Sequence, residues 1–185
     1  METQQHVCPW WLGYTFIIPW RKYQHNPQTI LGPHIKQGMT IMDYGSAMGY
    51  FSIHLARMTG ETGKVICVDI QQKMIDNLMR RAVKRKLENS ITPRLVGKDY
   101  DPAELKNQLD FVLLFAVVHE VPDKAALFND LFSMMKQGAK ILFAEPPGHV
   151  TPDEFKASLS LAQQAGLNIS DEKPGLKRLA VLLVK

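Results

Sequence analysis

Short apolar runs rich in β-branched residues alternate with amphipathic stretches along the chain from Met39 onward. Runs of this length between turn residues are typical of strands buried on both faces, and amphipathic helices between them indicate a parallel sheet covered by helices. The predicted strands are 40–44, 64–70, 92–96, 109–115 and 139–144. We therefore expect an α/β fold with a doubly wound, mostly parallel sheet.

Three of the intervening segments repeat their apolar residues at i, i+3, i+4 and i+7, so each forms a helix with one buried stripe. A fourth helix is predicted to begin after Thr151, because Pro152 suits the first helical position, and to end at Gly166. The three stripes are Phe51, His54, Leu55 and Met58; Ile75, Leu78, Met79 and Ala82; and Phe128, Leu131, Phe132 and Met135.

The last two extended runs, 168–171 and 179–184, are joined by a short Pro-Gly segment and predict an antiparallel pair that completes a seven-stranded sheet. A chain of 185 residues has the size of one domain. We expect a single domain over residues 1–185, with a catalytic core at 36–185 and a short helical and aromatic cap at 1–35.

The cap contains the segment WWLGYTFIIPW, which is almost wholly apolar but too short to cross a bilayer. Trp10, Trp11 and Tyr14 are candidates for a lid over a substrate pocket. The alternatives are that this segment packs as a second small core or contacts a membrane surface.

The composition is that of a folded domain, with 45% hydrophobic and 22% charged residues. The two cysteines are Cys8 and Cys67, and Cys67 lies within an apolar predicted strand, so a disulfide framework is not expected. We find no signal peptide and no membrane span in the sequence and expect a cytoplasmic location.

A glycine turn follows the first predicted strand, in the segment IMDYGSAMGYFS, and leads directly into a helix. Gly45 permits a tight turn, and Gly49 permits close approach of a ligand or the helix. A second strand ends at Asp69, whose carboxylate can accept both hydroxyls of a ribose. Together the turn and the carboxylate predict a nucleoside site.

Two nucleoside cofactors compete for such a site, and Asp43 separates them. A dinucleotide would place its pyrophosphate beside this carboxylate, and like charges repel. S-adenosylmethionine instead brings a sulfonium and an ammonium group, so an acidic strand end suits it. We therefore expect S-adenosylmethionine, with S-adenosylhomocysteine as product.

At these residues the sequence resembles the class I, Rossmann-like family of S-adenosylmethionine-dependent methyltransferases, with Ala47 at the central glycine of the family's first motif. The resemblance continues through Asp69, through GKDY and through LDFVLLFAVVHEVPD, and covers residues 36–184. It implies that the turn holds the methionine part, Asp69 the ribose and Asp99 the adenine amino group. The full set of cofactor-binding candidates is Asp43, Gly45, Ser46, Ala47, Gly49, Asp69, Ile70, Asp99, Tyr100 and Phe115.

Two further loops should meet at the carboxyl edge of such a sheet. His119 and Glu120 follow the fourth strand, whereas Glu145 and His149 follow the fifth. A histidine near its ordinary pKa can serve as a general base, so His119, Glu145 and His149 are the catalytic candidates. The alternative is that these side chains only close the strand ends by hydrogen bonds.

A metal site is a further hypothesis, because His6, Cys8, His119 and His149 are of ligand types that zinc accepts. Their spacing in the sequence does not specify a site. We leave the metal and the oligomeric state open.

The segment FAVVHEVPD is similar to the corresponding region of the ubiquinone and menaquinone biosynthesis methyltransferases and of arsenite methyltransferases. This similarity predicts methyl transfer to an oxygen, sulfur or carbon atom of a small molecule; with two cysteines, arsenite chemistry is not expected. One alternative is an RNA or protein methyltransferase that uses the basic stretch from Arg80 to Lys86, although we expect no nucleic-acid partner. Another is a non-catalytic S-adenosylmethionine-binding sensor or partner subunit.

Overall fold

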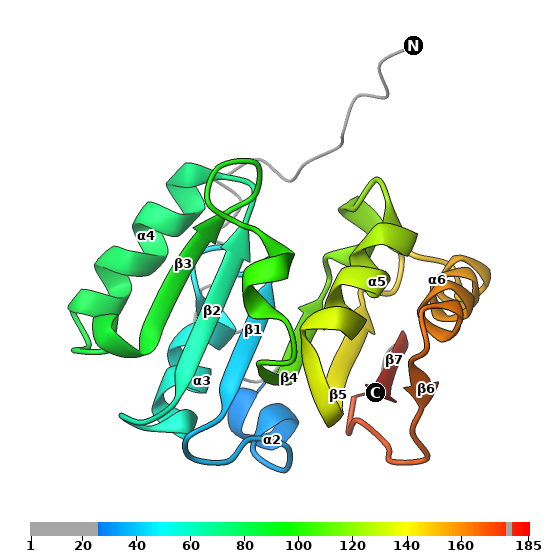
Figure 1. Cartoon of the computed structure of the whole chain (residues 1–185), viewed down its shortest axis with the longest axis horizontal. Coiled ribbons are helices and arrows are strands. Elements are labelled where there is room, and N and C mark those ends of the chain that lie inside the picture. Colours follow the sequence, from blue (N-terminus) through cyan, green and yellow to red (C-terminus); the bar gives the residue numbers. More distant parts are fainter. Residues whose placement is uncertain (1–25, 177–178) are drawn as a thin grey trace.

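The computed structural model describes residues 26–176 and 179–185, which build a seven-stranded sheet with helices on both faces (Figure 1). The strand order is β3-β2-β1-β4-β5-β7-β6, with β1 to β5 parallel and β7 antiparallel to β5 and β6. This confirms the predicted α/β fold and its antiparallel C-terminal pair. The strands are β1 (Thr40–Tyr44), β2 (Lys64–Asp69), β3 (Ile91–Leu95), β4 (Leu109–Phe115), β5 (Met135–Glu145), β6 (Asn168–Ile169) and β7 (Leu179–Val184).

All four predicted helices are present. Helix α6 begins with a capping box, in which Thr151 Oγ1 accepts from the Glu154 amide and the Glu154 carboxylate accepts from the Thr151 amide. The α-helices are α2 (Pro27–Leu31), α3 (Tyr50–Thr59), α4 (Gln72–Val83), α5 (Lys124–Met134) and α6 (Pro152–Gln164). Short 3₁₀ turns are η2 (Glu88–Ser90), η3 (Pro102–Leu105) and η4 (Val118–Glu120).

The start of β5 differs most from its predicted position. Met135 was expected on the buried stripe of the third helix, but it begins β5, four residues before the predicted strand. Met135 pairs with Leu109, and the register then shifts so that Lys140 pairs with Phe111. A single buried methionine between a helix and a strand fits both the helical and the strand pattern of apolar residues. The local sequence pattern therefore does not determine where α5 ends and β5 begins.

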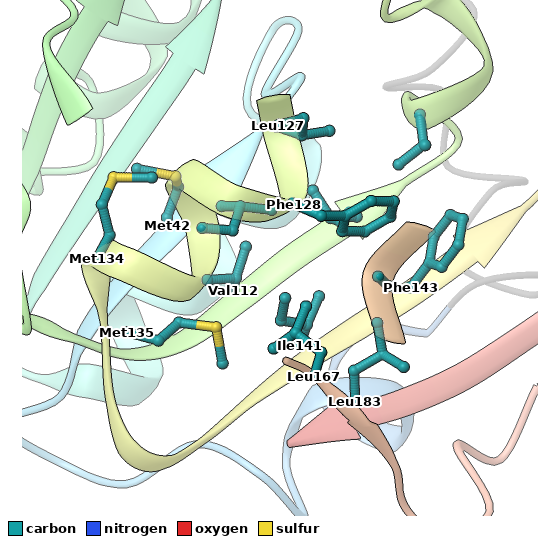
Figure 2. Packing of buried hydrophobic residues seen from close by; sticks show 14 of the residues in the cluster. Met42, Val112, Leu127, Phe128, Met134, Met135, Ile141, Phe143, Leu167 and Leu183 are labelled. Carbon is teal, nitrogen blue, oxygen red and sulfur yellow. The ribbon is translucent and has the colours of Figure 1, made fainter. Parts of the chain in front are cut away.

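The sheet separates two apolar layers. Figure 2 shows the layer under α5 and α6, where Met42, Val112 and Phe143 from the strands meet Phe128 from α5. Helices α2, α3 and α4 cover the opposite face, and the predicted cap region contributes Ile30 and Leu31 from α2 to this second layer. Burial on both faces explains why the strands read as continuous apolar runs.

The topology places one end of the sheet at a switch point. From β1 the chain builds outward through β2 to β3, and then returns to build β4 and β5 on the other side. In open α/β sheets a crevice for ligands opens beyond the carboxyl ends of the strands at such a reversal. In Figure 1 the arrowheads of β2 and β3 mark this edge at the top. Over the described residues, no helix is long and apolar enough to span a membrane.

Candidate functional site

A cavity of about 380 Å³ opens at this edge, between the carboxyl ends of β1, β2 and β4 and the turns that follow them. Its volume falls in the range of pockets for small molecules, which is about 300 to 1,000 Å³. The cavity therefore lies where the strand order reverses, as the topology predicts.

The glycine turn after β1 forms one wall. The amides of Gly45 and Ser46 donate to the Val68 carbonyl at 2.9 and 3.0 Å, which ties the turn to β2. Gly45 has a φ of +76°, and a Cβ at this position would lie 2.8 Å from the Cβ of Val117. A side chain at residue 45 would therefore be strained and would also collide with the loop after β4.

Asp69 at the end of β2 joins two loops. One carboxylate oxygen accepts from the Ala47 amide and the other accepts from the Gln71 amide, both at 2.9 Å. Burial raises the pKa of Asp69, and these backbone hydrogen bonds lower it. Asp43 is only 3% exposed and accepts from Ser52 Oγ at the start of α3. Both carboxylates are thus held in place by the scaffold.

The polar groups of the cavity suit a cationic ligand. Its described lining includes the carboxylates of Asp43, Asp69 and Glu120, and no lysine, arginine or histidine. The buried Ser46 Oγ lines the same wall and has no hydrogen-bond partner among the described residues. A buried hydroxyl without a partner is costly, so a polar ligand atom would satisfy it. Negative charge and this free hydroxyl fit the sulfonium and ammonium groups of S-adenosylmethionine.

Two alanines of the lining have left-handed backbones. Ala47 has a φ of +47°, and Ala116, directly after β4, has a φ of +59°. Such conformations are costly for residues other than glycine, and they concentrate at functional sites. The strain lies on both sides of the cavity.

A cluster of ionisable groups stands beside the cavity. The His119 amide donates to one oxygen of Glu145 at 3.0 Å, and His119 Nδ1 lies 2.7 Å from the other. Because a carboxylate only accepts hydrogen bonds, Nδ1 is the donor. Glu145 is 1% exposed, and its hydrogen bond to His119 is the main cause that raises the pKa of His119.

The other ring nitrogen of His119 lies near Glu120. Nε2 lies 3.9 Å from Oε1 of Glu120, whose pKa burial raises. The ring of His149 stands edge to face with that of His119, with centroids 6.2 Å apart. Two imidazoles and two carboxylates thus meet at the ends of β4 and β5.

A family model described as a methyltransferase domain matches residues 35–175, which is most of the chain. The chain belongs to this methyltransferase-domain family. Family and fold together confirm the prediction of a class I, S-adenosylmethionine-dependent methyltransferase domain.

Solved structures show the same fold over nearly the whole chain. A SAM-dependent methyltransferase from Aquifex aeolicus aligns with a TM-score of 0.79 at 20% identity, covering 96% of both chains. A TehB-like SAM-dependent methyltransferase from Corynebacterium glutamicum aligns with a TM-score of 0.70 at 13% identity, covering 94% of this chain and 97% of the other.

Curated relatives share the sequence of the domain. A demethylmenaquinone methyltransferase of Oceanobacillus iheyensis is 25% identical over 126 residues, 68% of this chain and 50% of its own length. A ubiquinone/menaquinone biosynthesis C-methyltransferase of Salmonella arizonae is 24% identical over 157 residues, 79% of this chain and 59% of its own length. This methyltransferase domain therefore spans about half to three fifths of the length of these relatives.

Most predicted cofactor residues of the methyltransferase domain line the cavity, and three do not. Gly49 is the N-cap of α3 and faces Leu78 of α4. A Cβ at residue 49 would lie 2.8 Å from Leu78 Cγ, so the lack of a side chain permits the two helices to pack closely. Asp99 accepts from the Leu95 amide and lines a separate depression with Tyr100. The predicted residues in the cavity wall are Asp43, Gly45, Ser46, Ala47, Asp69, Ile70 and Phe115.

The predicted catalytic residues are brought together, but beside the cavity. His119, Glu145 and His149 form the cluster described above, and none of them lines the cavity, whereas Glu120 does. Glu120 was not among the catalytic candidates, although its place after the fourth strand was visible in the sequence. Local sequence could not tell which of two adjacent side chains faces the ligand.

The metal hypothesis gains no support from residues 26–176 and 179–185, in which no group of three or more histidine, cysteine, aspartate or glutamate side chains is placed to hold a metal ion. His6 and Cys8, like the predicted lid residues Trp10, Trp11 and Tyr14, lie outside the described residues.

The basic stretch from Arg80 to Lys86 is only partly exposed to solvent. Arg81 is half-buried and donates to the Met48 carbonyl, so it supports the turn between β1 and α3. Arg80, Lys84, Arg85 and Lys86 are exposed.

Proposed function

We propose that this protein transfers a methyl group from S-adenosylmethionine to an oxygen, sulfur or carbon nucleophile of a small molecule. The observation that carries the proposal is the acidic cavity against the glycine turn, with the Ser46 hydroxyl in its wall, for which the described part of the chain offers no hydrogen-bond partner. The cofactor supplies an electrophilic methyl group on its sulfonium. The protein must hold this group and the acceptor in line.

Within this proposal, the glycine turn with Asp43 and Ser46 holds the methionine part of the cofactor. Asp69 accepts the ribose hydroxyls, for which its oxygens retain free lone pairs beside the two amides they already accept from. Ile70, which is 48% exposed, and Phe115 offer apolar surface to the adenine ring. Asp99 and Tyr100 would need to move with their loop to reach it.

The names of the curated relatives support a hydroquinone as the acceptor, because those enzymes act on demethylmenaquinone or in ubiquinone and menaquinone biosynthesis. The cavity wall after β4 agrees with such a ring, since Val117, Val121 and Pro122 are apolar. His119 and Glu145 remain in the proposed acid–base machinery, and His149 completes the cluster next to them. A single domain over residues 1–185 and a cytoplasmic location also stay part of the proposal.

Isothermal calorimetry with S-adenosylmethionine, S-adenosylhomocysteine and NAD tests the cofactor site. We expect micromolar affinity for the first two and none for NAD, whose pyrophosphate would meet the acidic wall. Asp69→Asn should lose this affinity, whereas Asp76→Asn, on the exposed face of α4, should retain it. Binding of NAD in place of S-adenosylmethionine would contradict the proposal.

A screen of hydroquinones, phenols and thiols with tritiated S-adenosylmethionine then tests turnover. Transfer to a hydroquinone supports the proposed acceptor, and transfer only to a thiol would replace it. Tight cofactor binding without transfer to any small molecule would favour a sensor or partner subunit over an enzyme.

A further inference from the structure

Glu120 is the ionisable side chain that the loop after β4 contributes to the cavity lining. Its neighbours in this wall, Val117, Val121 and Pro122, are all apolar. The carboxylate is partly buried, with 28% of its side chain exposed, and His119 and Glu145 stand next to it outside the cavity lining. Among the described residues, the part of the wall that follows β4 thus holds one charged group.

We propose that Glu120 is the group that takes the proton of the methyl acceptor. In this proposal His119 and Glu145 are positioning residues that orient Glu120 and favour its ionised form. This inference rests on the proposed methyltransferase function. It assigns the proton transfer to the side chain that lines the cavity in place of the histidine beside it.

The two nitrogens of His119 explain why the histidine acts through Glu120. Nδ1 donates to Glu145 at 2.7 Å, so it has no free lone pair for a substrate proton. Nε2 faces Glu120 at 3.9 Å, which is within ion-pair range when the ring is protonated. Both nitrogens are thus directed toward carboxylates, and only Glu120 reaches the cavity.

The proposed step balances with the groups present. The acceptor atom attacks the methyl carbon, the carbon–sulfur bond breaks, and its electron pair stays on sulfur, which becomes the neutral thioether of S-adenosylhomocysteine. The proton of the acceptor moves to a Glu120 oxygen and leaves to solvent after the product has departed. No oxidant or metal is needed.

The surrounding charges decide whether Glu120 is ionised and able to act as a base. Burial raises the pKa of Glu120, and Asp69 at the end of β2 and Glu145 at the end of β5 raise it further. His119 lowers it, with a smaller contribution from His149, and Lys124 of α5 opposes protonation of His119. Glu145 raises the pKa of His119, and the positive charge of the protonated ring beside Glu120 favours the ionised form of Glu120.

The chemistry of this wall also narrows the acceptor. One carboxylate among apolar side chains suits an apolar ring that directs one hydroxyl at Glu120, such as a phenol or a hydroquinone. A highly charged acceptor would find no cationic partner in the described lining.

The first test compares wild type, Glu120→Gln, Glu120→Asp and the control Glu61→Gln, whose side chain is exposed in a loop remote from the cavity lining. The rate of tritiated methyl transfer to naphthohydroquinone and the affinity for S-adenosylmethionine are measured for each. We expect Glu120→Gln to lower the rate by about 100-fold or more with cofactor affinity within about threefold, and Glu120→Asp to retain part of the rate. A Glu120→Gln rate like that of wild type, or a rate loss matched by lost cofactor affinity, would overturn the inference.

A pH profile tests the positioning role of Glu145. In Glu145→Gln the pKa of His119 should fall, and its charge should be lost at a lower pH. Loss of the His119 charge raises the pKa of Glu120, and removal of the Glu145 charge lowers it; because His119 is the larger of the two influences, the pKa of Glu120 should rise where the ring is neutral. The acid limb of the rate profile should therefore move to higher pH, which a merely structural loss would not produce. An unchanged acid limb would refute the positioning role.

A spectroscopic readout needs no turnover. Para-nitrophenol is titrated by absorbance in the presence of the S-adenosylhomocysteine complex of each variant. An ionised Glu120 that faces the phenol disfavours the phenolate, so wild type should raise the pKa of the probe and Glu120→Gln should not. Identical titrations in the two proteins would overturn the inference, whereas wild type that binds neither cofactor form would overturn the proposed function instead.

Discussion

Ala47 shows that backbone strain at a single residue is not visible in the sequence. At the central glycine of the family's first motif, an alanine reads as a mild change, because it adds one methyl group. In the structure the methyl group is not the difficulty. The backbone of Ala47 has a φ of +47°, a left-handed conformation that costs an L-residue about 1 to 2 kcal/mol.

Ala47→Gly should therefore stabilise the protein. Removing the left-handed strain offsets the entropy that a glycine loses on folding, and we expect a gain in unfolding free energy of up to about 1 kcal/mol. The measurement is the urea unfolding midpoint at an unchanged slope. Ala157→Gly, at an exposed position inside α6, is the matched control and should lose about 1 kcal/mol. Equal losses in both variants would show that Ala47 is not strained.

At the scale of elements, the strands and helices were largely predictable because their period is local. Burial of the sheet on both faces produces continuous apolar runs, and the capping residues of α6 stand next to one another in the chain. The start of β5 and the orientation of the loop after β3 were not predictable. In that loop Asp99 bonds back to Leu95, which depends on the path of the backbone and on no recognisable pattern.

The contact between the turn after β1 and the loop after β4 gives an element-scale prediction. Gly45→Ala places a Cβ 2.8 Å from the Cβ of Val117, in addition to the strain of a φ of +76°. Gly97→Ala is the matched control, because Gly97 has a φ of +78° and no atom of the described residues lies within 4 Å of an added Cβ, its chain neighbours aside. We expect Gly97→Ala to cost about 1 to 2 kcal/mol in unfolding free energy and Gly45→Ala about 1 to 3 kcal/mol more. If urea unfolding gives the two variants the same stability, there is no close steric contact between the turn after β1 and the loop after β4.

At the scale of the whole molecule, the cavity links β1, β2 and β4, so a bound cofactor should stabilise all of them together. At a concentration of about 100 times its Kd, a ligand raises the unfolding free energy by about 2.7 kcal/mol. For a domain of 185 residues this corresponds to an increase in Tm of about 5 to 10 °C. Thermal unfolding with S-adenosylmethionine checks this value. NAD at the same concentration and the Asp69→Asn variant should show no increase, and an equal shift with NAD would exclude the proposed cofactor preference.

The sequence by itself determined the α/β class, the family and many residues of the cavity wall. These features depend on short segments, in which a strand is followed by a glycine turn and the next strand ends at an acidic residue. Residues that are close in the sequence are therefore enough to predict them. Only the tertiary structure decided that Gly49 faces Leu78, that Asp99 caps its own strand, and that Glu120 lines the cavity while His119 bonds to Glu145. The physical reason is that the contacts of Gly49 and His119 join α3 to α4 and β4 to β5, where the direction of a side chain depends on how the elements pack. The Asp99 bond depends on the path of the loop after β3.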